Sequence, residues 1–455
     1  MASANHPIAE SLLPSLPARL VRSLSATCAI VLLAVALAAA TYAYPPPSMA
    51  LVLAGGVGLV GVLAVALTRY DVAVALGFLL LAVVKLEPAP PDMVFAVVMA
   101  VAAVTGRFDL TRVPFAVLGA LGVFITFNLL SMMEAIQPLT AARFISITLY
   151  LAVFSIWLAG YVNSARRARI VVLAYLAAAV ISAVLGSLAY LVGFPGSDAL
   201  LLGAEEETGS RVKGLFADAN VFAPFLIPIA LILLEEIIQP RLIRLRRSLK
   251  IVLLLVLLLG VTLAFSRAAY LNVAIGVLVM LAVLTLRRGG AGKAGALLAI
   301  VLSAGGIVAA TLVFTGSTGF LEERTQLQSY DTERFSAQRT GIELAEKHPL
   351  GIGPGQFELI SPVATHSTYI RTLAEQGLLG FISFFAVAAI TLLLAIRNAL
   401  RGWHTYGIGS AALLAAWCGI LTNSLVIDSL HWRHLWVLAA LIWAGAMAGA
   451  ARERA

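Results

Sequence analysis

Long uninterrupted apolar runs limit more than any other feature what this chain can fold into. About fourteen runs, each of roughly 16 to 24 residues, follow one another between short polar breaks. A run of this length crosses the bilayer as a helix, and none shows the alternation that a membrane barrel needs. With 61% of residues hydrophobic and 12% charged, a soluble globular surface is excluded. The sequence therefore predicts an all-α polytopic transmembrane bundle of about 12 to 14 spans.

Two breaks between the runs are long enough to be functional loops. They divide the chain into a cytoplasmic tail (1–24), transmembrane helices (25–315) that include a periplasmic loop at about 195–220, a long and partly helical periplasmic loop (316–375), and carboxyl-terminal transmembrane helices (376–455). The predicted spans are 25–44, 49–68, 71–86, 92–106, 113–132, 146–163, 170–193, 220–238, 250–266, 268–286, 294–315, 376–396, 408–426 and 434–450.

The positions of lysine and arginine predict how the chain is oriented in a bacterial inner membrane. Basic residues are retained in cytoplasmic loops, and with the amino terminus inside the main clusters all fall on the cytoplasmic side. Both termini are then cytoplasmic, and the two long loops are periplasmic. This bias accounts for the net charge of +8, so we expect membrane lipids and no nucleic acid as partners.

A few basic residues oppose this bias and lie at helix ends on the outer side. Arg211 and Lys213 directly precede a span, and Arg267 lies in the hinge between two spans. A guanidinium suits bidentate recognition of phosphate, so two converging arginines would bind a lipid-linked diphosphate. The alternative is that Arg267 snorkels to the interface and that Arg211 pairs with a glutamate of residues 205–207.

His366 stands near the end of the long loop, just before a span. A histidine takes up a proton near neutral pH, which is what activating a sugar hydroxyl requires, although most loop histidines are ordinary polar surface. The glycine-rich segment Gly351–Gly355 predicts an irregular turn that positions the segment carrying His366. No histidine pair has metal-ligand spacing with a carboxylate, so we predict no catalytic metal and no cofactor.

Several further side chains are secondary candidates. Arg334 and Arg339 lie on a predicted loop helix, where at least one of them would be part of a solvated face. Tyr369 and Arg371, within about a helical turn of His366, would orient it or the acceptor. For Asp218 and Asn220 we favour capping of the following helix.

Four motifs in this order resemble the superfamily of O-antigen ligases and polymerases. They are residues 211–223, Ser266-Arg267, residues 351–357 and residues 365–369, and the resemblance extends over about 200–395. Such enzymes pass a glycan from undecaprenyl diphosphate to an acceptor sugar on the periplasmic face. The resemblance places Arg211 and Arg267 at the diphosphate and His366 at the acceptor hydroxyl. The chain departs from the family pattern in two ways. Ala219 stands where the family commonly has proline, and the number of predicted spans is larger than usual.

The sequence thus predicts a metal-independent, inverting glycosyltransferase with a lipid-linked glycan donor and a glycan or lipid A-core acceptor. The reaction would be either lipopolysaccharide ligation or polysaccharide polymerisation. The alternative is a transporter or flippase of lipid-linked oligosaccharide. Such a carrier would keep ionisable residues near the bilayer midplane, whereas Lys85, Glu235 and Glu236 lie at the ends of spans.

Overall fold

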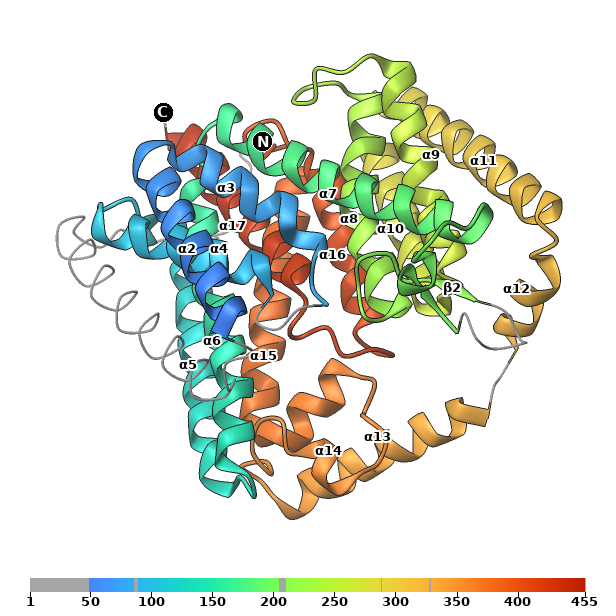
Figure 1. Ribbon diagram of the computed structural model, residues 1–455. Coiled ribbons are helices and arrows are strands. Elements are labelled where there is room, and N and C mark those ends of the chain that lie inside the picture. Colours follow the sequence, from blue (N-terminus) through green and yellow to red (C-terminus); the bar gives the residue numbers. More distant parts are fainter. Residues whose placement is uncertain (1–48, 86–88, 204–209, 288, 327–328, 455) are drawn as a thin grey trace, which may run out of the picture.

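Helices make up most of the chain in the computed structural model, which describes residues 49–85, 89–203, 210–287, 289–326 and 329–454 (Figure 1). The predicted tail and first span, 25–44, lie outside these residues. The described strands, β1 (Leu201–Leu202) and β2 (Arg211–Val212), form a short antiparallel pair. The all-α prediction is confirmed.

Every predicted span from 49–68 onward coincides with a helix. In the described chain, eight helices are long and apolar enough to cross a bilayer, and four more apolar helices have 10–17 residues. The protein is therefore a multi-pass membrane protein. Together with α9, which is in neither group, the helices at the predicted spans are α2 (Met49–Thr68), α3 (Tyr70–Leu79), α4 (Pro90–Val104), α5 (Phe115–Ser131), α6 (Pro138–Tyr161), α7 (Ala165–Leu191), α8 (Ala219–Ile238), α9 (Arg247–Leu263), α10 (Arg267–Leu286), α11 (Ala291–Phe314), α15 (Thr368–Leu400), α16 (Ser410–Asn423) and α17 (Arg433–Arg454).

The helices differ widely in how deeply they lie in the bundle. In α8 and α17, 89% of the apolar stretch is buried inside the protein, whereas in α11 only 17% is buried. A helix that is apolar all round and also buried forms the centre of a membrane bundle, and a peripheral one faces lipid. Other helices therefore surround α8 at the centre of the bundle, and α11 lies at its edge (Figure 1).

The basic loops meet one another at one end of the bundle. Arg169 Nε at the start of α7 donates to the Leu242 carbonyl between α8 and α9 at 2.9 Å. Arg287 after α10 donates to the Ala399 carbonyl at the end of α15. Because these segments come from four different connections, their contacts agree with the segregation of charge that the sequence predicts.

The long loop forms a second layer across the other end of the bundle. It contains α12 (Thr318–Thr325), α13 (Ser329–Lys347) and α14 (Phe357–Ile360), and α13 extends across the lower edge of the view (Figure 1). The predicted loop helix is thus present. Its inner side packs through Ala337 on a small cluster with Phe357 and Ala374.

The glycine-rich turn is irregular, as the sequence predicts. Gly351, Gly353 and Gly355 all have positive φ, and a Cβ at Gly351 would lie 2.3 Å from the Glu375 carbonyl oxygen. Only glycine fits such a close backbone approach. The turn thereby packs directly on α15, where Gly377 (φ 69°, ψ −177°) interrupts the helix. The residues from Thr368 to this interruption form the first part of α15.

Candidate active site

Arg211 is joined to the hinge between α9 and α10. Its Nε donates to the Ala264 carbonyl at 2.9 Å, and its Nη2 donates to Asn220 Oδ1 at 2.8 Å. The same Asn220 oxygen accepts from Ser266 Oγ at 2.9 Å. Asn220 therefore ties β2, α8 and the hinge together, so the expectation that its side chain caps a helix is wrong.

Asp218 does cap α8. Its carboxylate accepts a hydrogen bond from the Asn220 backbone N–H at 2.8 Å, as an N-cap residue does. The glutamates of residues 205–207, which we considered as partners of Arg211, lie outside the described residues. The local fold of Asp218 and Asn220 thus fixes the position of Arg211 from two sides.

The hinge that carries Arg267 has an unusual backbone. Phe265 has φ 46°, a left-handed conformation that is rare outside glycine, and its ring is buried between those of Tyr190 and Phe320. The next residue, Ser266, caps α10 by accepting from the Ala269 N–H. Such conformations persist only where surrounding packing holds them, and they cluster at functional sites.

Arg267, the first residue of α10, binds the loop layer. Its Nη2 donates to both carboxylate oxygens of Asp331 on α13, at 2.7 and 2.9 Å, and its Nη1 donates to the Gln326 carbonyl at 3.1 Å. Its side chain is 31% exposed and does not simply extend to an interface. A guanidinium that holds a carboxylate in this way has the chemistry to hold a phosphate.

His366 lies in the segment before α15 and also has a left-handed backbone, with φ 45°. Burial, and secondly the positive charge of Arg334, lower the pKa of His366 below its ordinary value of 6.5, while Asp218 and Asp428 act in the opposite direction. The ring makes no hydrogen bond or ion pair with any described residue. His366 is therefore neutral near pH 7 and able to accept a proton.

Hydrogen bonds and electrostatic interactions link these residues. Asp331, bound to Arg267, lies one helical turn before Arg334, whose charge acts on His366. On the other side, Asp218 acts on His366 and begins the helix whose Asn220 holds Arg211. The structure therefore brings Arg211, Arg267 and His366 to the same end of the bundle from three distant parts of the chain.

The family model for O-antigen ligase matches residues 252–385. Over these residues the chain is similar to O-antigen ligases. The matched region begins in α9, ends within α15, and includes Arg267 and His366 but not Arg211. No curated protein matches the chain. Within the described residues, no group of three or more His, Cys, Asp or Glu side chains is placed to hold a metal ion.

Two of the secondary candidates in the matched region, Tyr369 and Arg371, hold α15 in place. Tyr369 donates from its hydroxyl to the Leu421 carbonyl of α16 at 3.1 Å. Arg371 forms ion pairs with Glu358 and, at 3.0 Å from Nε to Oδ2, with Asp428. Tyr369 therefore anchors α15, and Arg371 pairs with Asp428, one of the groups whose charge acts on His366.

The remaining candidates differ in exposure. Arg339 lies on the outer side of α13, where it pairs with Glu343 at 3.3 Å, and its side chain is 84% exposed. It forms the solvated face that we expected for one of the two loop arginines. Lys213 is half-buried. The pKa of Lys85 is lowered, first by partial desolvation and secondly by the positive charge of Lys213, so the two lysines lie near each other. Lys85 Nζ donates to the Ala199 carbonyl.

Sequence reasoning missed two carboxylates of this candidate site. Asp331 was seen only as part of a polar helix, and Asp428 was not singled out at all. Asp428 Oδ1 accepts from the Leu430 N–H at 3.1 Å and from Thr368 Oγ1 at 3.3 Å, which places it beside the segment of His366. Its position between two apolar runs, on the outer side of the predicted topology, was the available signal.

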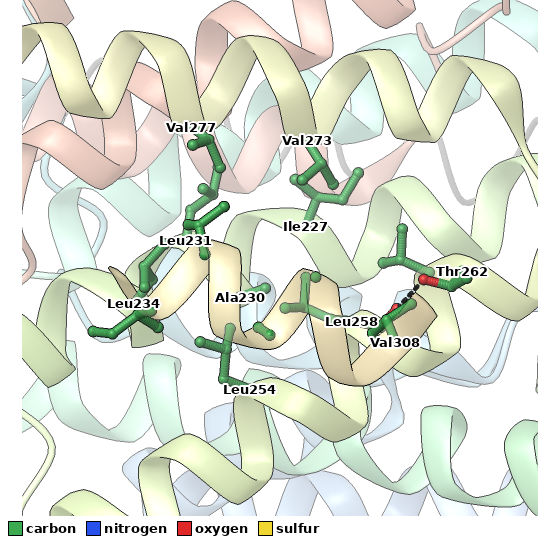
Figure 2. Close-up of a pocket in the computed structure, with 15 residues that line it drawn as sticks. Ile227, Ala230, Leu231, Leu234, Leu254, Leu258, Thr262, Val273, Val277 and Val308 are labelled. Carbon is green, nitrogen blue, oxygen red and sulfur yellow. Dashed lines mark hydrogen bonds between the residues drawn. The ribbon is translucent and has the colours of Figure 1, made fainter. Parts of the chain in front are cut away.

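An apolar cavity of about 170 Å³ lies between α8, α9, α10 and α11. Figure 2 shows that its side chains, among them Leu231, Leu258 and Val273, point toward one another, with Thr262 and Leu234 at opposite ends. Thr262 belongs to the last turn of α9. The cavity therefore reaches from within the bundle toward the hinge that carries Arg267.

Proposed function

We propose that the protein is an O-antigen ligase-type glycosyltransferase. It transfers a glycan from undecaprenyl diphosphate to an acceptor sugar hydroxyl on the periplasmic face, in lipopolysaccharide ligation or polysaccharide polymerisation. The observation that carries the proposal is the series of hydrogen bonds and electrostatic interactions that links Arg211, Arg267 and His366 at one end of the bundle. The match of residues 252–385 to the O-antigen ligase family supports the same reaction class.

The diphosphate of the donor would bind between the two arginines. Arg267 already holds two carboxylate oxygens, and phosphate oxygens would take their place when the donor enters. Lys213 and Lys85 add positive charge on the same side, where the developing charge of the leaving group needs it. Donor binding would therefore loosen the attachment of α13 to α10.

The transfer itself needs one base. The acceptor hydroxyl oxygen attacks the anomeric carbon, the bond from that carbon to the phosphate oxygen breaks, and undecaprenyl diphosphate leaves with the electron pair. The hydroxyl proton passes to a ring nitrogen of His366. Because attack comes from the side opposite to the diphosphate, the configuration at the anomeric carbon inverts. A diphosphate is a good leaving group, so no metal is invoked.

The apolar cavity suits the hydrocarbon part of such a donor. Its lining is aliphatic apart from Thr262, and it ends near the hinge where the diphosphate would be held (Figure 2). An isoprenoid segment packed in this cavity by van der Waals contacts would bring the headgroup toward Arg267. A lipid-linked donor accounts for this neighbourhood better than a free sugar nucleotide does.

Transport of lipid-linked oligosaccharide is the competing function. The ionisable residues Glu235 and Glu236 lie in the last turn of α8, where they bind Arg241 and Lys250, and not at the middle of the bundle. Coupled carriers need ionisable groups along the path through the membrane. The distribution of charge therefore favours the transferase.

The test measures release of undecaprenyl diphosphate by the purified protein from an undecaprenyl-diphosphate glycan in the presence of acceptor. His366→Asn is the sharpest variant, because asparagine tolerates the left-handed backbone but does not act as a base at neutral pH. We expect its rate to fall by about 100- to 10 000-fold. His348→Asn, at an exposed loop histidine, is the control and should keep full activity. Full activity of His366→Asn would exclude His366 as the base.

Arg267→Lys tests the diphosphate site separately. Lysine keeps the charge but loses the planar fork, so binding of the donor should weaken while the base is untouched. We expect KM for the donor to rise roughly 10- to 100-fold, with a smaller change in KM for the acceptor. An unchanged donor KM would place the diphosphate elsewhere.

A further inference from the structure

A second pocket lies at the end of the bundle opposite to the candidate active site. It has a volume of about 350 Å³ and is formed by the end of α8, the α8–α9 connection and the first turn of α9 (Figure 1, top of the view). Four of its lining residues are basic, Arg241, Arg244, Arg247 and Lys250, and one, Glu236, is acidic. It is unrelated to the transfer reaction and needs its own explanation.

The buried charges of this pocket are already paired. Glu236 accepts from the backbone N–H groups of Arg241, Leu242 and Ile243, and its Oε2 lies 3.3 Å from Lys250 Nζ. Arg241 Nη1 lies 3.0 Å from Glu235 Oε1. Two carboxylates therefore compensate two of the four cations, and they fix the shape of the connection.

Arg244 and Arg247 are the two cations that these carboxylates do not reach. Both are exposed, and neither side chain makes a hydrogen bond or ion pair with a described residue. They line the same pocket, so their positive charges add there. Two guanidinium groups around one hollow create a site for an anion with several oxygens, such as a phosphate.

An apolar strip leads from this pocket along α9. Leu249 and Val252 of α9 are 44% and 52% exposed, and their spacing of three residues puts them on one side of the helix. Leu245, in the connection before α9, is 36% exposed. Since α9 is one of the predicted spans, this side contacts the hydrocarbon of the membrane. A ligand with a phosphate at one end and acyl chains at the other would match both parts.

We propose that the pocket binds the headgroup of an anionic phospholipid, phosphatidylglycerol or cardiolipin, from the membrane leaflet at this end. Arg244 and Arg247 hold the phosphate, and the acyl chains lie along Leu249 and Val252. Basic pockets beside membrane spans on the cytoplasmic side recognise such lipids. The site is independent of the proposed transferase activity.

The experiment measures lipid binding by native mass spectrometry on the full protein in detergent, with phosphatidylglycerol, cardiolipin or phosphatidylcholine added. The double variant Arg244→Gln/Arg247→Gln should weaken binding of both anionic lipids by roughly 25-fold, since each basic group contributes about fivefold. Phosphatidylcholine should bind weakly to both proteins. Because neither arginine has a hydrogen-bond or ion-pair partner in the described part of the chain, the thermal unfolding of the variant should match that of the wild type.

The matched control is Arg69→Gln/Arg166→Gln, which removes the same charge from the same end. Arg166 pairs with Asp71 on α3, away from the pocket, and is 80% exposed. This control should bind anionic lipids like the wild type. An equal loss in both double variants would reduce the effect to general surface charge and overturn the proposal. Equal binding of phosphatidylcholine, or displacement of the lipid by millimolar inorganic phosphate, would overturn it as well.

Discussion

Two residues near the candidate active site have left-handed backbone conformations, which are rare for residues other than glycine. Phe265 and His366 have φ of 46° and 45°, and each directly precedes a capping serine, Ser266 or Ser367, that begins a helix. Such a conformation costs about 1–3 kcal/mol and persists only where packing enforces it. Both positions therefore present their neighbouring polar groups at fixed angles, which a site for direct displacement requires.

The charges around His366 predict how activity depends on pH. Burial and Arg334 lower the pKa of His366, so the neutral base predominates at pH 7 and is lost only as the pH falls through a value below 6.5. Arg334→Gln removes a charge that opposes protonation, which raises this pKa. The acidic limb of the kcat/KM profile should then move to higher pH than in the wild type.

Arg339→Gln provides the comparison for this pH profile, because Arg339 lies on the same helix and carries the same charge. Its guanidinium pairs with Glu343 in solvent and is not among the groups that act on His366. Its acidic limb should coincide with that of the wild type. A shift of equal size in both variants would mean that the total charge of α13, and not the position of Arg334, controls the base.

At the scale of elements, α13 is attached to the bundle by two separate contacts. One is the ion pair of Asp331 with Arg267, and the other is the apolar cluster around Ala337 and Phe357. The ion pair is partly exposed and lies where phosphate would bind. The cluster is buried and lies beside the glycine-rich turn, so it would keep α13 in place when the ion pair opens.

Asp331→Asn should free the amino-terminal half of α13. The charge-assisted pair is lost while the side chain keeps its size, and amide hydrogen exchange in this half should accelerate by about tenfold or more. Exchange beyond Ala337 should change little. Glu343→Gln, which breaks only a solvent-exposed pair on the same helix, is the control. Unchanged exchange in Asp331→Asn would show that the apolar cluster alone holds α13.

At the scale of the whole molecule, polar contacts between distant segments lie at two opposite ends of the bundle. The basic connections bond to one another at one end, as Arg169 does to Leu242. The other end carries the loop layer and the candidate active site (Figure 1). If the positive charge marks the cytoplasmic side, the loop layer faces the periplasm.

Cysteine labelling tests this orientation directly. In a background with Cys28→Ala and Cys418→Ala, Thr332→Cys on the exposed side of α13 should react with a membrane-impermeant maleimide in intact spheroplasts. Arg166→Cys, at the basic end, should react only after the membrane is permeabilised. The reverse labelling pattern would put the candidate active site in the cytoplasm, where the proposed donor reaction does not take place.

The candidate site could be predicted only in part from the sequence. Arg211 and Arg267 stood out because each is basic on the side where the charge bias disfavours it, and His366 because a histidine takes up a proton near neutral pH. Their partners did not stand out, because in the sequence alone Asn220 and Asp428 look like ordinary capping or loop residues. Asn220 in fact accepts from two segments that lie 9 and 46 residues away along the chain.

The sequence by itself determined the all-α class, the position of nearly every helix and the segregation of charge. These properties depend on the local solvent of each segment, and lipid demands long helices whatever their neighbours are. The tertiary structure alone decided that Asp331 meets Arg267, that Arg334 and Asp218 act on one histidine, and that two arginines are left around a second pocket. Such contacts depend on packing between distant segments, which no local pattern encodes.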